Sequence, residues 1–247
     1  MNACTAGPER VRAPAHCFAA ALRIGHTAQV SNPPDSSQLD AIRTSYDRVA
    51  DAYAEAIFDE LDKKPFDREL LKRFAAATSG CGAVVEIGCG PGQVARFLRD
   101  LDADVSGIDL SSGMVEQARR LNPNIAFRIG DMTALDCENG SIAAIVGFYA
   151  IVNLAPELRR RAFREMARVL APGGQLLLGF HVGGEVLSES ELWGRPIEMD
   201  FYLLDPEIIR AELQSEGFVV QELAIREPYA PDVEHQTRRA YLWVRKS

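Results

Sequence analysis

The chain has 247 residues and a formal net charge of −8. This acidic balance argues against nucleic acid as the main partner, because proteins that bind phosphate backbones usually carry a surplus of Lys and Arg. The length suits one α/β domain with additions, and no apolar stretch approaches the ~20 residues needed to cross a bilayer. We therefore expect no association with a membrane.

The five cysteines are odd in number and form no CxxC pair. This pattern fits the reducing cytoplasm better than a disulfide framework. The four histidines have no spacing typical of metal ligands. We expect a cytoplasmic protein without a metal site.

Residues 1–37 contain four prolines among alanines and small polar residues, and they predict a flexible tail. The apolar run 18–22 is too short for a signal peptide, and no small-residue cleavage pattern follows it. No function follows from this segment.

Two helices are predicted after the tail. Apolar residues recur at three- and four-residue steps over 38–61, and a second helix should run over 68–77 with Asp67 as its cap. Tyr46 and Tyr53 lie two turns apart on one face of the first helix. Packing in the core is one interpretation of this pair.

From residue 79 onward, the pattern alternates between strands and helices and indicates a doubly wound sheet. The carboxyl ends of its parallel strands should meet at one edge, where ligands bind in such sheets. The predicted strands lie near 83–88, 104–109, 125–130, 142–149 and 175–181, and the predicted helices near 93–100, 112–121 and 157–170.

After residue 182 the chain changes character. The segment up to Leu204 contains Trp193, Phe201 and Tyr202, which are candidates for a pocket wall or for core packing. A helix near 206–215 and strands near 218–225 and 239–245 should complete the chain. Neither a repeat nor a linker divides it.

The most informative stretch is 84–98, which starts with Val-Val-Glu-Ile-Gly-Cys-Gly-Pro-Gly. An apolar strand leads into glycines at 88, 90 and 92, which let the backbone approach a ligand closely. The helix from about Gln93 directs its free N–H groups toward that ligand. A dinucleotide fingerprint would have its third glycine at Gln93, and a phosphate-binding loop would need a Gly-Lys-Ser/Thr ending. The stretch therefore predicts a different nucleotide-cofactor loop.

This loop resembles the first motif of the class I S-adenosylmethionine-dependent methyltransferases of the small-molecule type. Three further segments resemble that family in the same order along the chain. Val105–Ser111 resembles its second strand with a terminal acid, Ile125–Met132 its third strand with an acid, and Leu170–Leu178 its Pro-Gly-Gly turn into the fifth strand. Four ordered motifs are more specific than a single glycine loop.

The resemblance implies an α/β fold: a Rossmann-like seven-stranded methyltransferase sheet, mostly parallel with the last strand antiparallel beside the fifth, and an N-terminal helical lid. It also implies one methyltransferase domain over 38–247. Within this domain we expect a helical lid at 38–78, a cofactor-binding core at 79–182, and an acceptor-side segment with the C-terminal strands at 183–247.

The resemblance further implies that S-adenosyl-L-methionine binds at the strand edge and leaves as S-adenosyl-L-homocysteine. Asp109 stands 21 positions after Gly88, where an acid can accept both ribose hydroxyls. Asp131 would take the adenine amine while the Met132 N–H reaches the ring, although it could also be a plain loop aspartate. Glu86 would hold loop amides or lie toward the cofactor's amino group. The full expected cofactor-binding set is Glu86, Gly88, Cys89, Gly90, Gly92, Asp109, Leu110, Met114, Asp131, Met132 and Phe148.

The expected catalytic residues are His181, Tyr46 and Tyr53. His181 ends the fifth strand and is a candidate to take a proton from an acceptor hydroxyl near neutral pH. The alternative is a histidine bonded to a neighbouring loop. The family often has tyrosines on a first helix that closes over the cofactor. The segment 147–154 lacks the histidine or the acid-Pro-Pro-Tyr sequence of some relatives, which counts against a nucleic-acid base as acceptor.

The resemblance thus implies an enzyme that methylates a small organic acceptor on oxygen, nitrogen or carbon by in-line displacement, without metal or covalent intermediate. Natural-product metabolism is one setting for such a reaction. A catalytically inactive, methyltransferase-like binding subunit is the alternative, and an NAD-dependent oxidoreductase is disfavoured by Gln93. Two points stay open: the acceptor, and whether the N-terminal helices close their own site or that of a partner in a homo-oligomer.

Overall fold

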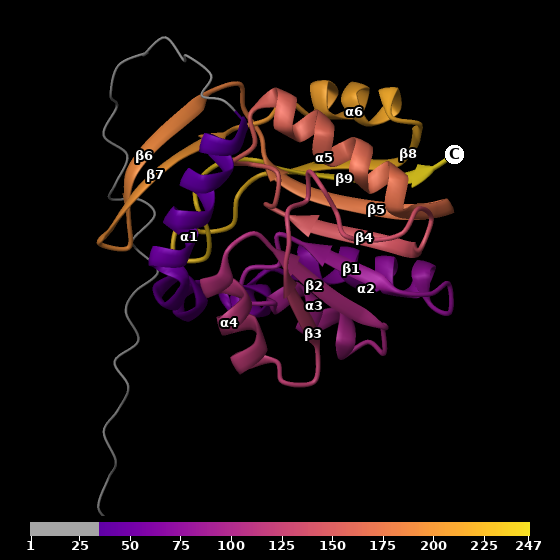
Figure 1. Ribbon diagram of the computed structural model, residues 1–247, viewed down its shortest axis with the longest axis horizontal. Coiled ribbons are helices and arrows are strands. Elements are labelled where there is room, and N and C mark those ends of the chain that lie inside the picture. Colours follow the sequence, from indigo (N-terminus) through magenta and orange to yellow (C-terminus); the bar gives the residue numbers. More distant parts are fainter. Residues whose placement is uncertain (1–34) are drawn as a thin grey trace, which may run out of the picture.

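The computed structural model describes residues 35–247 (Figure 1). In this part of the chain a seven-stranded sheet has the order β3-β2-β1-β4-β5-β9-β8. These strands are Val84–Ile87 (β1), Val105–Asp109 (β2), Ala126–Ile129 (β3), Ile142–Phe148 (β4), Leu170–His181 (β5), Phe218–Arg226 (β8) and Arg239–Lys246 (β9). β1 to β5 pair in parallel, and β9 lies antiparallel between β5 and β8. The expected fold class is confirmed.

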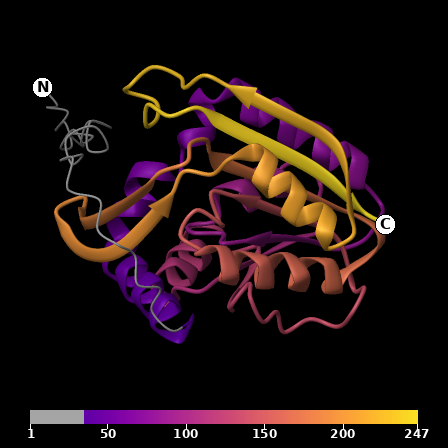
Figure 2. The same cartoon turned by 90° about the horizontal axis from the view of Figure 1, so that it is seen from above.

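Helices cover both faces of the sheet (Figures 1 and 2). They are Asp35–Ile57 (α1), Pro65–Thr78 (α2), Gln93–Arg99 (α3), Ser112–Leu121 (α4), Pro156–Val169 (α5) and Pro206–Ser215 (α6), with a short 3-10 turn at Glu60–Lys63 (η2). Apolar residues of α5 and α6 form one core with the sheet. Those of α2, α3 and α4 form a second core. β1 and most of β4 are buried without alternation, as expected for central parallel strands.

The N-terminal helices differ from the sequence expectation. α1 begins at Asp35 and ends at Ile57, so the last three residues of the expected tail are helical; residues 1–34 lie outside the described part. α2 begins at Pro65, which suits a first helical position because no N–H is needed there. The predicted cap role of Asp67 is therefore wrong: it lies inside the first turn, 1% exposed, and pairs with Arg226.

A β-hairpin follows β5, where the sequence indicates only an aromatic-rich segment. Its strands are Val186–Leu192 (β6) and Arg195–Tyr202 (β7), which pair antiparallel. Figure 2 shows the hairpin alongside α1, and Ser45 of α1 bonds to both the N–H and the carbonyl of Glu198. Trp193 and Tyr202 contact α1 residues rather than a cavity. Packing against the first helix therefore explains these aromatic residues.

The fifth strand also starts earlier than expected. The Pro-Gly-Gly turn expected ahead of this strand, Pro172-Gly173-Gly174, falls within the bounds of β5, where the pairing with β4 shifts register between Ile142 and Ala144. Among the described residues, no helix has both the length and the apolarity that a membrane crossing requires.

Candidate functional site

A cavity lies at the carboxyl-terminal edge of the parallel strands, with an empty volume of about 670 Å³ that is partly open to solvent. α1 forms one wall, and the loops after β1, β2, β3 and β4 form the rest. Most of the predicted site residues line it: Tyr46, Tyr53, Gly88, Gly90, Asp109, Leu110, Met114, Asp131, Met132 and Phe148. Glu86, Cys89, Gly92 and His181 are not part of this lining.

The glycine loop shapes the cavity floor. Gly88, Gly90 and Gly92 all have positive φ, which glycine adopts without strain. Gly92 packs against Phe127 and Asn122 instead of the cavity, and Cys89 is buried in the core. The loop therefore presents two glycines to a ligand and uses the third for packing.

Glu86 lies beneath this loop, 3% exposed, and its Oε2 accepts a hydrogen bond from the Ala95 N–H at 2.7 Å. This N–H belongs to the first turn of α3, where amides lack partners within the helix. Burial raises the pKa of Glu86 well above its usual value. Of its two expected roles, the structure places Glu86 in the first, holding an amide.

Asp109 ends β2 and joins two loops. Its Oδ2 accepts from the Gly90 N–H at 2.8 Å and its Oδ1 from the Ser111 N–H at 2.9 Å. Burial raises the pKa of Asp109 to about 6, although these hydrogen bonds oppose the shift; the nearby charge of Asp47 adds to it. Each carboxylate oxygen keeps a lone pair that can accept from a ligand hydroxyl.

Asp131 caps its own loop. Oδ1 accepts from the Thr133 N–H at 2.7 Å, and Oδ2 from the Thr133 hydroxyl at 2.8 Å. This arrangement is the plain loop role that the sequence left open, yet Asp131 and Met132 also line the cavity. Its carboxylate thus has both a structural partner and access to a ligand.

The two tyrosines of α1 stand in the cavity wall. The Tyr46 hydroxyl donates to Asn153 Oδ1 at 2.7 Å, and Asn153 Nδ2 donates to the Asp200 carbonyl at 2.8 Å. Tyr53 contacts Tyr46 and Trp193 edge-to-face, with ring centroids 6.0 and 5.3 Å apart. Burial raises the pKa of both tyrosines, so at neutral pH they are hydrogen-bond donors rather than bases.

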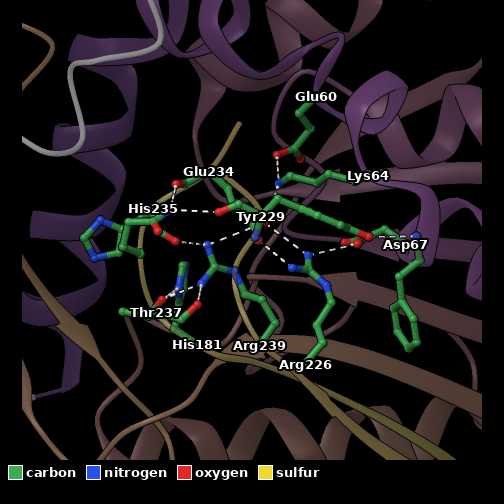
Figure 3. A network of polar contacts seen from close by, with 12 residues as sticks. Glu60, Lys64, Asp67, His181, Arg226, Tyr229, Glu234, His235, Thr237 and Arg239 are labelled. Atoms are coloured by element: carbon green, nitrogen blue, oxygen red, sulfur yellow. Dashed lines mark hydrogen bonds and ion pairs between the residues drawn. The ribbon is translucent and has the colours of Figure 1, made fainter. Parts of the chain in front are cut away.

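His181 lies behind the cavity wall. Its Nδ1 lies 2.7 Å from the hydroxyl of Thr237, in the loop between β8 and β9 (Figure 3). Its ring centroid lies 4.9 Å from that of Tyr149. Desolvation lowers the pKa of His181 well below its usual value, and the Arg239 charge adds to this effect. These contacts match the alternative interpretation, a histidine bonded to a neighbouring loop.

A network of buried charges extends from this loop to η2 and α2 (Figure 3). Glu234 lies among three cations: it bonds to Arg226, and its Oε2 lies 3.6 Å from Lys64 and 3.7 Å from Arg239. Lys64 also pairs with Glu60 at 2.6 Å, and Arg226 with Asp67 at 3.0 Å. The sequence has no motif for this network because its members are scattered from residue 60 to residue 239.

Two of the lining residues that the sequence did not single out have informative surroundings, Asn153 and Tyr149. Asn153 holds Tyr46, and nothing in its sequence neighbourhood signals this partner. Tyr149 has φ of 60°, which is uncommon outside glycine, and its buried hydroxyl has no hydrogen-bond partner among residues 35–247. Strained residues and unpaired buried polar groups often occur at functional sites. Only a view of the backbone and of the packing could reveal them.

Known proteins are similar to this chain over the segments that line the cavity. A family described as a methyltransferase domain matches residues 84–174. A demethylmenaquinone methyltransferase of Beutenbergia cavernae is 35% identical over 95 residues, covering 38% of this chain and 39% of that protein. An uncharacterized 37.1 kDa transposon protein of Streptomyces fradiae is 31% identical over 180 residues, covering 70% of this chain and 46% of that protein. The chain therefore spans less than half the length of these two relatives.

A structure described as a SAM-dependent methyltransferase from Methanosarcina mazei has the same fold. It superposes with a TM-score of 0.61 at 17% sequence identity, covering 66% of this chain and 92% of that chain. The matched segment 84–174 contains the glycine loop and the acids after β2 and β3, which surround the cavity. The motifs, the strand order and the family model that matches residues 84–174 together support a class I S-adenosylmethionine-dependent methyltransferase.

Proposed function

We propose that this protein transfers a methyl group from S-adenosylmethionine to a small organic acceptor by direct in-line displacement. The observation that supports the proposal is a cavity with room for both the cofactor and the acceptor. Gly88, Gly90 and Asp109 line one part of it, and Phe148 and Asn153 line another. S-adenosylhomocysteine would be the product.

The donor groups of the cavity fit this cofactor. Asp109 has free lone pairs for the ribose hydroxyls, and Asp131 offers a carboxylate to the adenine amine. Gly88 and Gly90 put no side chain in the way of the methionine part. When bound, S-adenosylmethionine supplies an activated methyl group on a sulfonium centre.

The protein contributes alignment and exclusion of water. Tyr46 and Tyr53 of α1 cover the cavity with their rings, and ordering of two reactants in one site can lower a barrier by up to about 7–11 kcal/mol. The raised pKa of both tyrosines and the position of His181 behind the wall make these three residues weak general bases. We infer an acceptor whose nucleophile needs little help with deprotonation.

Calorimetric titration with S-adenosylhomocysteine tests the cofactor site. The wild type should bind with a dissociation constant in the micromolar range, and Asp109→Ala should weaken binding about 100-fold because two charge-assisted hydrogen bonds are lost. Asp104→Ala is the matched control. It removes an exposed acid that directly precedes the first residue of β2, whereas Asp109 is the last residue of that strand. No binding by the wild type would contradict the proposal.

Turnover tests the enzyme. The wild type is incubated with methyl-labelled S-adenosylmethionine and a panel of phenols, amines, carboxylates and 1,3-dicarbonyl compounds. Transfer of label to any of them supports the proposal. Binding of S-adenosylhomocysteine without transfer to any acceptor would favour the alternative, a cofactor-binding subunit without activity.

A further inference from the structure

Asp47 of α1 accepts hydrogen bonds from residues at the N-terminus of α4, which packs against α1. Its Oδ1 accepts hydrogen bonds from the Ser111 hydroxyl at 2.6 Å, the Ser112 hydroxyl at 3.2 Å and the Gly113 N–H at 2.8 Å. The Ser111 hydroxyl in turn accepts from the Met114 N–H at 3.0 Å as the helix cap. The N-terminus of α4 thus has a cap of its own and a carboxylate from a different helix.

The two helices approach closely at this point. A Cβ atom on Gly113 would lie 3.1 Å from the Ala50 Cβ and 3.2 Å from both the Cα and the carbonyl oxygen of Asp47. These distances are tighter than ordinary contacts, so glycine permits the approach. One turn further along, Asp51 accepts from the Gln117 side chain. α1 is therefore docked on α4 by packing and by two carboxylates.

The same turn holds the acid of the cofactor site. The Ser111 N–H donates to Asp109 Oδ1 at 2.9 Å, while the Ser111 hydroxyl donates to Asp47. Ser111 is 1% exposed, and both it and Met114 line the cavity. Any shift of Ser111 relative to α1 would consequently move a hydrogen-bond donor of Asp109.

We propose that Asp47 is a positioning residue for the nucleoside end of the cofactor site: it fixes Ser111, which in turn orients the Asp109 carboxylate toward the ribose hydroxyls. Docking of α1 and binding of the nucleoside are then thermodynamically linked, so each favours the other by the same factor. The inference rests on the proposed cofactor site, and it adds a residue that makes no contact with the ligand.

The charge of Asp47 also acts on Asp109 directly. Burial is the main cause of the raised pKa of Asp109, and Asp47 raises it further. The other titratable groups that face Asp109 are Tyr46 and Tyr53 from α1 and Glu86 and Cys89 from β1 and its loop. Burial raises the pKa of all four.

Three variants separate positioning from a merely structural role. Asp47→Ala removes the hydrogen bonds and the charge, and Asp47→Asn keeps an acceptor oxygen but removes the charge. Asp51→Ala is the matched control, because Asp51 also lies on α1 and bonds to α4 but has no link to Asp109. Both aspartates are exposed, so these substitutions leave no cavity in the core.

The first measurement is the dissociation constant of S-adenosylhomocysteine at pH 7.5. We expect Asp47→Ala to weaken binding about tenfold, Asp51→Ala to change it less than about twofold, and Asp47→Asn to restore most of the affinity. Equal affinities of Asp47→Ala and Asp51→Ala would overturn the inference while the proposed function stands. Absence of binding by the wild type would overturn both.

The second measurement is the pH dependence of the same constant. In the wild type the affinity should fall below about pH 6, because protonated Asp109 no longer accepts two ribose hydroxyls. Asp47→Asn should move this fall to lower pH by about half a unit, since a neighbouring negative charge is gone. An unshifted profile would show that Asp47 does not act on Asp109.

The third measurement is hydrogen exchange in residues 35–57. Saturating S-adenosylhomocysteine should slow exchange in α1 of the wild type and of Asp51→Ala, and should do so less in Asp47→Ala. Equal protection in all three proteins would overturn the linkage between docking and binding. This readout stays informative even if Asp47→Ala also lowers global stability.

Discussion

The two ends of the strand edge are built from different contacts. At the cofactor end, Asp109 and Asp131 bond to amides that are 19 residues away or fewer, and most lie only two residues away. At the other end, Arg226 pairs with Asp67, 159 residues away in sequence. The Tyr241 hydroxyl donates a hydrogen bond to the same Asp67, 174 residues away. Hydrogen bonds to nearby amides hold the carboxylates of Asp109 and Asp131 at the first end, and long-range ion pairs hold the second. Substitutions at the two ends should therefore have different consequences for binding and for stability.

The largest effect is expected at Glu234, which lies among Arg226, Lys64 and Arg239. Glu234→Ala leaves these buried cations short of a carboxylate and should lower the free energy of unfolding by about 3–5 kcal/mol. Urea unfolding at pH 7.5 measures this loss. Glu227→Ala, at a neighbouring exposed acid, is the control and should change stability by less than about 0.5 kcal/mol. A loss below about 1 kcal/mol for Glu234→Ala would mean that the network does not hold this end together.

At the cofactor end, the free energy of unfolding and the affinity for S-adenosylhomocysteine should change in opposite directions with pH. The pKa of Asp109 is raised to about 6 by burial, above its usual value of 3.8. The folded protein therefore binds this proton more tightly than the unfolded chain, so its stabilising contribution is present below about pH 4 and is lost as pH rises to about 6. The loss is at most about 3 kcal/mol and is reduced because the cavity admits solvent.

Urea unfolding of the wild type and of Asp109→Asn between pH 4 and 7 separates the contribution of Asp109 to the free energy of unfolding from that of other titrating groups. The wild type should lose stability relative to the variant as pH rises, while its affinity for S-adenosylhomocysteine rises over the same range. Parallel changes of stability and affinity with pH would contradict this description of the cofactor end.

Two tyrosines of the cavity lining, Tyr46 and Tyr149, allow the same chemical change at two positions. Tyr46→Phe removes the donor of the 2.7 Å bond to Asn153 Oδ1, and Asn153 is 4% exposed. An unpaired buried amide oxygen should cost about 1–2 kcal/mol of unfolding free energy. Thermal unfolding with S-adenosylhomocysteine absent measures the loss. An unchanged melting temperature would show that water replaces the hydroxyl at no cost.

Tyr149→Phe is the smallest expected effect and has the opposite sign. Within the described part of the chain the buried Tyr149 hydroxyl has no partner, while the Tyr149 ring contacts His181 and lies near the Lys64 and Arg239 cations. Removal of this hydroxyl should leave stability unchanged or raise it by up to about 1 kcal/mol. A loss comparable with that of Tyr46→Phe would indicate a bonded water at Tyr149. The pair thus compares one hydroxyl that has a protein partner with one that has none.

Much of the cofactor end could be read from the sequence. The glycine loop, Asp109 and Asp131 occur in strand–turn–helix contexts, and parallel strands bring their carboxyl ends to one edge whatever the rest of the chain does. Ten of the predicted residues accordingly line one cavity. Glu86, Cys89 and Gly92 lie in the same motif but not in the lining: Glu86 bonds to α3, Cys89 is buried in the core, and Gly92 packs against Phe127 and Asn122.

The other end of the strand edge, around His181, Asp67 and Arg226, could not be predicted from such motifs. His181 was placed correctly at the end of β5, but its partner Thr237 lies 56 residues away, in a loop with no local signature. Asp67 has the form of a helix cap in the sequence and is a buried partner of Arg226 in the structure. A carboxylate is compatible with both roles, and only the packing of α2 against β8 and β9 decides between them.

The sequence by itself determined the alternation of strands and helices between residues 84 and 181, the edge at which the acids gather and the resemblance to a methyltransferase family. These properties depend on hydrophobic periodicity, on turn residues and on motifs, all of which act within short stretches of chain. The tertiary structure alone decided which charges pair beneath Tyr149, which hydroxyl stays without a partner and how Asp47 reaches Ser111. Those contacts join residues that are far apart in the chain, and the free energy of such a contact exists only after the chain has brought its partners together.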